Sequence, residues 1–460
     1  MTKLLNSIET IPLLSGPTLL FVHQAGTPRL SINIYTKGGN CIDYFPGEMD
    51  VIDRLLLKGT YAETSEEIAV KLDDLCLDLD TDTARDYSIM SASMQAEDLE
   101  KNLAFIKDLL FYSTLEGLQK EKEKLKGELQ MSLDSPTAVA KDLLSRKLWN
   151  GLPYGTSAST MLSSLGKLWR NDNVFLHYQQ AYRPNRMVIS VAGDVDRERL
   201  ITALDAAFSL PRAKGTDGEM EMGRLFKEHR LKESRIFTTP WEEAAQAQIL
   251  QSWLMPPATS KDYVPLAVLD NILGSAGLSS RLFLELRDKQ GLAYSVRSSL
   301  SLLKHRGTFT LYIGTEPSNV QKCLEGFADE VKKLQDVLVG EEELENAKRN
   351  LIGKRSVFLE TVGQTSSYVG SAYLAGHDLK SLASLDEKIN AVTAEQIQKV
   401  AQKYLSKESV TVVVAPSEFL PKSPFFKHSK QDDTTTTETE AKAKTSTKKD
   451  DKTETAPVAV

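Results

Sequence analysis

The amino-acid sequence predicts an α+β protein made of two homologous domains, each a mainly antiparallel sheet with helices packed on one face. A pattern of elements occurs twice, a polar segment separates the two copies, and the composition changes abruptly near the C-terminus. A chain of 460 residues is long enough for two domains with separate cores. We expect a first domain at residues 1–212, a linker at 213–234, a second domain at 235–422 and a disordered tail at 423–460.

The clearest repeat is an amphipathic helical segment followed by a strand. In the first half, residues 164–182 precede the strand-like run 187–192, and in the second half residues 384–404 precede the run 410–415. Both runs are rich in valine or isoleucine, as buried strands are. A capping box that begins at Thr393 marks a helix start in the second copy.

Further elements along the chain also occur in pairs. Residues 31–35 and 246–251 each alternate in polarity, which predicts one strand near the front of each half. Apolar residues at helical spacing form stripes in 99–110 and in 320–334. Such stripes indicate core packing, so the two halves are expected to share one architecture.

The linker and the tail are predicted from composition. Residues 213–234 are polar and charged and contain glycine, which is typical of a connection between domains. Beyond Ser429 the chain is mostly threonine, lysine, alanine and acidic residues and contains no aromatic residue. Such a segment cannot offset its ordering entropy by burial. We expect a disordered tail that solubilises or loosely tethers the protein.

Charge and cysteine content exclude several classes of function. The net charge of −7 gives no reason to expect nucleic acid or an anionic membrane as a partner. Cys41, Cys76 and Cys323 are odd in number and widely spaced, so neither a disulfide framework nor a cysteine metal site is expected. No apolar run has the length of a signal peptide core or a membrane span. A cytoplasmic location is the expectation.

A distinctive motif surrounds the pentapeptide Asp50-Val51-Ile52-Asp53-Arg54. Gly47-Glu48-Met49 precedes it, and Leu55-Leu56-Leu57-Lys58-Gly59-Thr60 follows it. This frame resembles the pitrilysin/insulinase family of zinc peptidases, the inverzincins, and within it the processing-peptidase-like branch. In that family the pentapeptide reads H-x-x-E-H, in which two histidines bind zinc and the glutamate activates water.

The resemblance implies that the zinc motif is degenerate here. The two histidine positions are occupied by Asp50 and Arg54, and the base position by Asp53. Glu128 matches the family's third zinc ligand, although it also fits a solvated acid in a charged run. Asp50, Asp53 and Glu128 offer oxygen ligands for a harder ion, but an ion pair of Arg54 with a neighbouring acid explains the charges more simply. We therefore expect no metal and no catalytic residue in this chain alone.

The histidines provide no alternative zinc site that the sequence can identify. No pair has the spacing of two ligands on one helix, so each is expected to be a surface or helix-cap residue. The six are His23, His177, His229, His305, His377 and His428.

A second signature lies at residues 277–296 and is similar to the second-domain signature of the same family. There, an arginine and a tyrosine seven positions apart face the zinc; the arginine grips the substrate backbone and the tyrosine stabilises the oxyanion. Arg287 and Tyr294 match this pair. Taken singly, Arg287 would fit an ion pair with Glu285 or Asp288, and Tyr294 a half-buried core position. Arg281 is expected to be mainly structural.

The loss of one half of the site and the retention of the other implies a subunit role. The resemblance predicts a non-catalytic, substrate-binding subunit of a heterodimeric zinc metallopeptidase that acts on peptides or unfolded protein segments. Its partner would be a homologous subunit that carries the zinc. Two alternatives remain: a catalytically inert structural subunit, like the core proteins of the cytochrome bc1 complex, and a peptide-binding homodimer.

Overall fold

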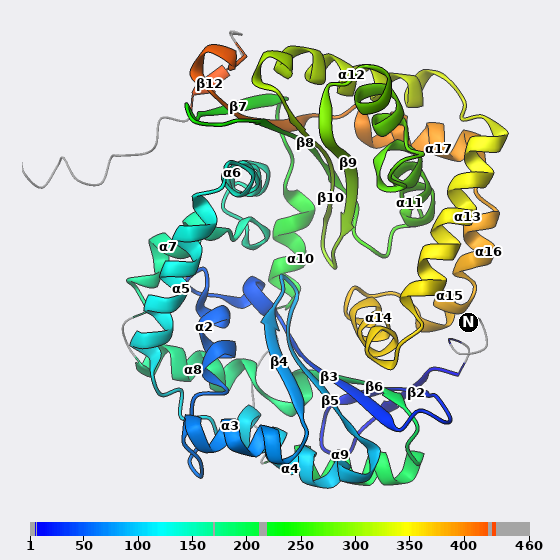
Figure 1. Cartoon of the computed structure of the whole chain (residues 1–460). Helices are drawn as coiled ribbons and strands as arrows, with labels where there is room; N and C mark the ends of the chain where they lie inside the picture. Colours follow the sequence, from blue (N-terminus) through cyan, green and yellow to red (C-terminus); the bar gives the residue numbers. More distant parts are fainter. Residues whose placement is uncertain (1–4, 6, 169–170, 211–218, 422–425, 429–460) are drawn as a thin grey trace, which may run out of the picture.

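Two six-stranded sheets, one in each half of the chain, organise the protein (Figure 1). The computed structural model describes residue 5 and residues 7–168, 171–210, 219–421 and 426–428. The first sheet contains β1 (Glu9–Pro12), β2 (Thr18–His23), β3 (Arg29–Lys37), β4 (Asp78–Thr83), β5 (Tyr87–Gln95) and β6 (Met187–Gly193). The second contains β7 (Arg235–Pro240), β8 (Ala247–Met255), β9 (Ala293–Leu302), β10 (Gly307–Thr315), β11 (Ser409–Ala415) and β12 (Phe426–His428).

Helices connect and cover these sheets. Those of the first half are α2 (Glu48–Leu55), α3 (Ser65–Asp74), α4 (Leu99–Phe111), α5 (Leu118–Leu133), α6 (Pro136–Trp149), α7 (Ala158–Leu165), α8 (Asn171–Ala181) and α9 (Arg197–Phe208). After α10 (Glu219–Glu228), the second half contains α11 (Tyr263–Asp270), α12 (Val320–Asp336), α13 (Glu341–Phe358), α14 (Val362–Leu374), α15 (Leu379–Ala383), α16 (Leu385–Asn390) and α17 (Ala394–Val400). The π-helix η6 (Phe283–Lys289) precedes β9.

The strand orders confirm the predicted duplication. They are β1-β2-β6-β3-β5-β4 and β12-β7-β11-β8-β10-β9, so β3 corresponds to β8 and β6 to β11. Pairing is antiparallel apart from β2 with β6 in the first sheet and β7 with both β11 and β12 in the second. Every residue of β6 and of β11 is buried, which explains the β-branched, apolar sequences that predicted these central strands.

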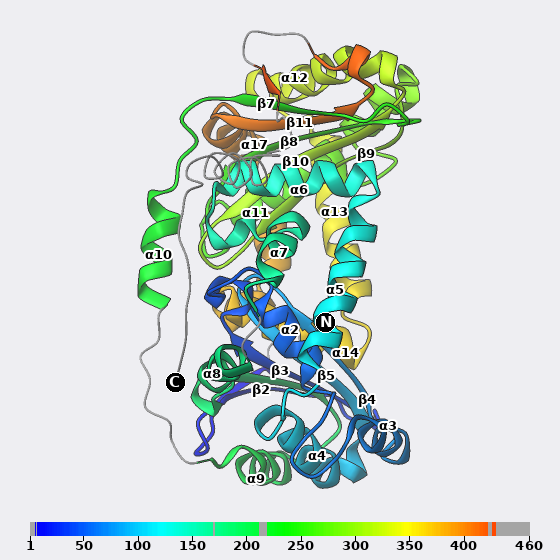
Figure 2. The same cartoon turned by 90° about the vertical axis from the view of Figure 1, so that its left-hand side faces the viewer.

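Each sheet is covered on its second face by a helix from the other half. Helix α6 packs on β8 and β11, and α14 packs on β3 and β6. The long helices α5 and α13 run between the halves and lead into α6 and α14 (Figures 1 and 2). The prediction of helices on one face therefore describes each half's own helices, and the exchanged helix completes the second face.

Close backbone approach fixes α14 against the first sheet. The Nδ2 of Asn33 donates to the Oγ of Ser366 at 2.9 Å, and the hydroxyl of Ser190 donates to the Ser366 carbonyl at 2.8 Å. A Cβ on Gly370 would lie 2.2 Å from the ring of Tyr35, so only glycine allows this helix to sit so close.

The structure differs in detail from the sequence prediction in the helical segments, the linker and the tail. Neither helical segment is a single helix. Residues 164–182 contain the end of α7 and all of α8, and residues 384–404 contain α16, α17, which begins with the Thr393 capping box, and most of the π-helix that follows it. The predicted linker contains α10, and the range predicted to be disordered contains β12, which pairs with β7. Residues 429–460 lie outside the described residues. In the described ranges, no helix combines the length and apolar character that a membrane span requires.

Candidate functional site

The degenerate motif lies on α2, between α5 and β4. Its apolar residues Met49, Val51, Ile52 and Leu55 are fully buried and anchor the helix in the core. Gly47 caps the helix with a φ of 90°, a conformation that favours glycine. Asp50 and Arg54 are half-buried, one helical turn apart, so α2 presents them on one face.

Arg54 forms a bidentate ion pair with Glu128 of α5. Its Nη1 lies 3.1 Å from Oε1 and its Nη2 lies 2.6 Å from Oε2 of Glu128. The hydrogen bonds from Arg54 lower the pKa of Glu128, and the same bonds raise the pKa of Arg54. This is the ion pair with a neighbouring acid that the sequence favoured over an all-oxygen metal site. A guanidinium thus holds the one carboxylate that matches a family zinc ligand.

Asp53 is tied into the protein interior. Its side chain is 2% exposed and accepts hydrogen bonds from the hydroxyls of Thr83 and Tyr182. Burial raises the pKa of Asp53 to about 7, against the lowering effect of these hydrogen bonds. A carboxylate committed to two hydroxyl groups inside the core is not placed to activate a water in an open chamber.

Asp50 has a different environment from that of Asp53. Its Oδ2 accepts a hydrogen bond of 2.7 Å from Asn40, and burial raises its pKa to about 6. Within the described residues, Asp50, Asp53 and Glu128 do not form a group of mutually close ligand atoms. The residues at this motif therefore do not fit zinc: a fixed cation stands at one histidine position, and the acids point to separate partners.

The second-half pair is close together and open. The guanidinium of Arg287, on η6, lies 5.0 Å from the ring centre of Tyr294, the second residue of β9. It also lies 4.6 Å from the ring centre of Phe283. Such stacking fixes the plane of a guanidinium while its N–H groups remain available. Tyr294 is 78% exposed, so its hydroxyl is accessible from solvent.

The structural alternatives for this pair do not describe what is observed. Glu285, the acid considered for Arg287, instead binds Lys289 at 2.6 Å. Tyr294 is exposed rather than a half-buried core residue. Arg281, expected to be structural, forms a bidentate pair with Glu343, with both distances 2.8 Å.

Local packing explains why η6 and β9 present these side chains. Leu286 is fully buried beside Gly326, where a Cβ would approach its Cδ2 to 2.3 Å. Gly291 takes a φ of 63°, which lets the chain turn from η6 into β9. Leu292 then donates its N–H to the Leu286 carbonyl at 2.8 Å, which sets the offset between helix and strand.

The structure therefore brings the predicted residues together as two separate groups. Arg54 pairs with Glu128 in the first half, and Arg287 stacks on Tyr294 in the second. The hydrogen bonds of Asp50 and Asp53 go to first-half residues.

Sequence reasoning missed a buried polar group next to α2. His177, expected at the surface or at a cap, is 3% exposed and lies beside Glu48. A signal was present, because His177 follows Val174 by three positions on the inward face of α8.

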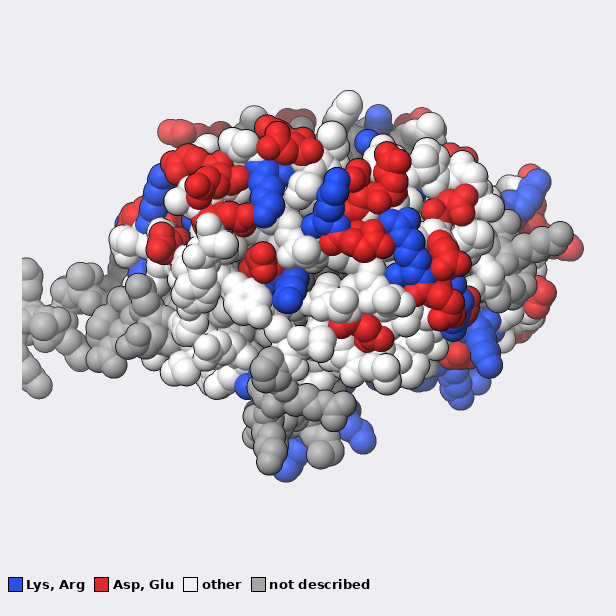
Figure 3. All heavy atoms as spheres, turned by 90° about the horizontal axis from the view of Figure 1, so that it is seen from below, with Lys and Arg blue, Asp and Glu red and all other residues white. Residues whose placement is uncertain are grey.

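The face formed by α3, α4 and α9 carries interspersed acidic and basic side chains (Figure 3). Ion pairs such as Arg199 with Glu100, at 2.7 Å, join opposite charges there. This face does not present the continuous basic surface with which proteins bind nucleic acid.

Comparison with protein-family models gives two adjacent matches. Residues 26–160 match the model described as Insulinase (Peptidase family M16), and residues 171–351 match the model described as Peptidase M16 inactive domain. Together the two matches cover more than half of the chain. The boundary between the two matched ranges does not coincide with the boundary between the two sheets.

Curated relatives and solved structures agree with these matches. The chain is 27% identical over 376 residues to the uncharacterized zinc protease YmxG of Bacillus subtilis, covering 80% of this chain and 88% of that protein. An uncharacterized zinc protease of Rickettsia felis is 24% identical over 413 residues, covering 88% and 96%. The crystal structure of a peptidase M16 inactive domain from Pseudomonas fluorescens has a TM-score of 0.79 at 19% identity, covering 89% of this chain and 98% of that one. A protease from Helicobacter pylori has a TM-score of 0.80 at 19% identity, covering 89% and 100%. The structural likenesses concern the fold alone.

Proposed function

Since the chain belongs to the insulinase (M16) family of peptidases, we propose that it is the non-catalytic, substrate-binding subunit of a heterodimeric zinc metallopeptidase. The observation that carries this proposal is the contrast between two arginines. Arg54 fills the zinc-motif position and is paired with Glu128, whereas Arg287 is stacked on Tyr294 with its hydrogen-bond donors available. The zinc ion and the water-activating base would belong to a homologous partner subunit.

The chemistry of Arg287 and Tyr294 fits the completion of a partner's site. A peptide carbonyl becomes negatively charged when water attacks it, and a phenol donor aimed at that oxygen stabilises the charge. Tyr294 would supply this hydroxyl. Arg287 would bind main-chain carbonyl oxygens with its fixed fork of donors, which does not depend on the substrate's side chains.

The free edges of the sheets support an extended peptide as the substrate class. In the described part of the chain, β4 is one of the two terminal strands of the first sheet and β9 one of the two terminal strands of the second. An edge strand offers unpaired main-chain groups that can bind an extended segment by β-augmentation. Peptides and unfolded protein segments offer such an extended, unpaired backbone along their length.

The names of the relatives support the proposed partner, and the free cysteines support the proposed cytoplasmic location. Several curated relatives are named zinc proteases, so a zinc-bearing member of this family is the natural partner. Cys41, Cys76 and Cys323 are free thiols, which fits the reducing environment of the cytoplasm.

Copurification and reconstitution test the proposal. The full chain, tagged and isolated from its native host, should copurify with a zinc-bearing homologue of similar size, identified by mass. The separated subunits should each lack activity on an unfolded protein substrate, and mixing them should restore it. The proposal is wrong if the isolated chain cleaves peptides in a chelator-sensitive way. It is also wrong if the copurified partner is fully active without this chain. That result would leave this chain a structural role.

A further inference from the structure

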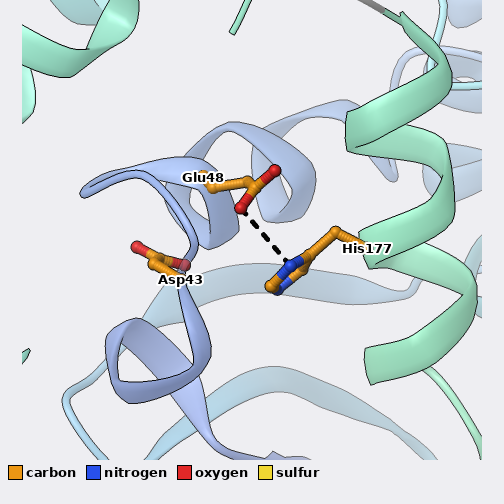
Figure 4. Close-up of side chains that lie close together, drawn as sticks. All are labelled: Asp43, Glu48 and His177. Atoms are coloured by element: carbon orange, nitrogen blue, oxygen red, sulfur yellow. Dashed lines mark ion pairs between the residues drawn. The ribbon is translucent and has the colours of Figure 1, made fainter. Parts of the chain in front are cut away.

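A buried polar cluster next to α2 has no part in the proposed peptidase chemistry. Asp43 lies in the loop before α2, Glu48 is the first residue of α2, and His177 comes from α8. Their side chains converge from these three elements (Figure 4). One ligand atom from each lies within 4.8 Å of the others, and the Nδ1 of His177 lies 3.3 Å from the Oε2 of Glu48.

Helix capping accounts for the two acids but not for the histidine. Asp43 accepts the N–H groups of Gly47 and Met49 at 2.9 Å, and Glu48 accepts that of Tyr44 at 3.1 Å. Acids at a helix N-terminus stabilise it in this way. His177 is not needed for such a cap.

The His177 ring is the unexplained member of the cluster. His177 is only 3% exposed, and neither ring nitrogen has a hydrogen-bond partner among the described residues. Its Nδ1 faces Glu48 without hydrogen-bond geometry. An unsatisfied buried imidazole costs free energy unless another group binds it.

We propose that Asp43, Glu48 and His177 form a binding site for a divalent transition-metal ion of the zinc type, distinct from the degenerate motif position at Arg54. One imidazole nitrogen and two carboxylate oxygens are ligands that zinc accepts, with water in the fourth position. Ligands in a tetrahedral zinc site lie about 3.4 Å apart, so closure requires side-chain movements of about 1 Å. The backbone N–H groups that bind both carboxylates would orient the ligands.

The composition of the cluster fits a dication. Two carboxyl groups lie close to one imidazole whose nitrogens have no hydrogen-bond partner among the described residues. A bound dication would neutralise both carboxylates and occupy the free imidazole nitrogen. It would link α8 to the start of α2.

Metal binding to the full chain tests this inference. After removal of metal with a chelator, titration with Zn²⁺ should show one tight site per chain and a rise in Tm. Glu48→Gln, which keeps the side-chain shape, and His177→Asn should each weaken Zn²⁺ binding by at least about 100-fold, beyond the cost of losing outer-sphere support. Glu128→Gln is the matched control and should bind Zn²⁺ like the unaltered chain.

Cobalt substitution tests for a thiolate ligand independently of the variants. Co²⁺ in this site should give visible d–d bands without the near-ultraviolet charge-transfer band of a thiolate ligand, which excludes Cys41 as the donor. If His177→Asn does not fold, as judged by circular dichroism, Glu48→Gln and the Co²⁺ spectrum decide. The inference is overturned if the folded, unaltered chain binds no stoichiometric Zn²⁺. It is equally overturned if Glu48→Gln leaves binding unchanged, if Glu128→Gln abolishes it, or if the thiolate band appears.

Discussion

Arg54 in the first half and Arg287 in the second half stand in opposite electrostatic situations. The guanidinium of Arg54 is held by both oxygens of Glu128, whereas that of Arg287 lies over the rings of Phe283 and Tyr294. A guanidinium paired with a carboxylate has its charge and its donors engaged, while one stacked on aromatic rings keeps its N–H groups for another ligand. Two halves built on one sheet order thus differ in what they can still bind.

Asp53 in the first region and Tyr294 in the second differ in whether their hydrogen-bonding groups are engaged inside the protein. Asp53 is buried and accepts hydrogen bonds from Thr83 and Tyr182, so its hydrogen-bonding capacity is used inside the protein. Tyr294 is exposed at the start of an edge strand. The first region is a closed polar network, and the second is an open set of donors. Each of the following measurements tests one side of this contrast.

The largest effect is expected for Tyr294→Phe in the reconstituted complex. Removal of one donor to an oxyanion lowers turnover by roughly 10²–10³, while assembly should not change because the substitution keeps the aromatic ring. Steady-state kinetics on an unfolded protein substrate and sedimentation of the complex measure the two properties. Tyr61→Phe is the control, since Tyr61 is 73% exposed in the loop between α2 and α3. Equal turnover for the Tyr294→Phe and control complexes would contradict the open-donor interpretation.

Arg287→Ala should have the next largest effect, which falls mainly on KM. Hydrogen bonds from a charged group contribute about 1.5–3 kcal/mol, so kcat/KM should fall roughly ten- to hundredfold. A grip on the backbone that acts equally in ground and transition states raises KM when it is lost and leaves kcat little changed. The control is Lys289→Ala, which removes a positive charge from the same helix but one already paired with Glu285. If both variants lose activity equally, the effect is one of general charge and not of the Arg287 donors.

The buried polar network around Asp53 predicts that the free energy of unfolding depends on pH. Burial raises the pKa of Asp53 to about 7 in the folded protein, above the value of 3.8 that is usual for an aspartate. Between these pH values the folded state holds a proton that the unfolded state has released. The contribution of Asp53 to the free energy of unfolding is therefore full at low pH and is lost as pH rises toward 7. The slope approaches about 1.4 kcal/mol per pH unit.

Asp53→Asn isolates that contribution from those of other buried groups. Asn cannot titrate, so the difference in free energy of unfolding between the unaltered chain and Asp53→Asn should fall as pH rises from about 4 to 7. Denaturant titrations at several pH values measure this difference. A difference that is independent of pH would mean that Asp53 ionises as freely in the folded protein as in the unfolded chain.

The sequence could predict the elements of this structure better than their long-range partners. The β-branched runs that became β6 and β11 and the capping box at Thr393 act locally, so their patterns were sufficient. The exchange of α6 and α14 between the halves depends on close contacts such as that of Gly370 with Tyr35, which are distant in sequence.

The same limit applies to the candidate site. The charges of the motif were enough to predict an ion pair of Arg54, and the resemblance to the family's second-domain signature singled out Arg287 and Tyr294. The burial of Asp53 against Tyr182, which lies 129 positions away, has no local signal. Ligand spacing along one helix cannot reveal the cluster around His177, because its neighbours Asp43 and Glu48 come from other elements.

The smallest effect is expected for the ion pair that distinguishes the first region. The side chains of Arg54 and Glu128 are 35% and 55% exposed, so water screens their attraction and the pair should contribute only about 0.2–1 kcal/mol. A double-mutant cycle of Arg54→Ala and Glu128→Ala, followed by denaturant unfolding, measures the coupling free energy. High salt should reduce it. A coupling of several kcal/mol would mean that the pair is a main determinant of the fold. A small value means that Arg54 affects chemistry more than stability, because its fixed charge occupies the position where a zinc ligand would stand.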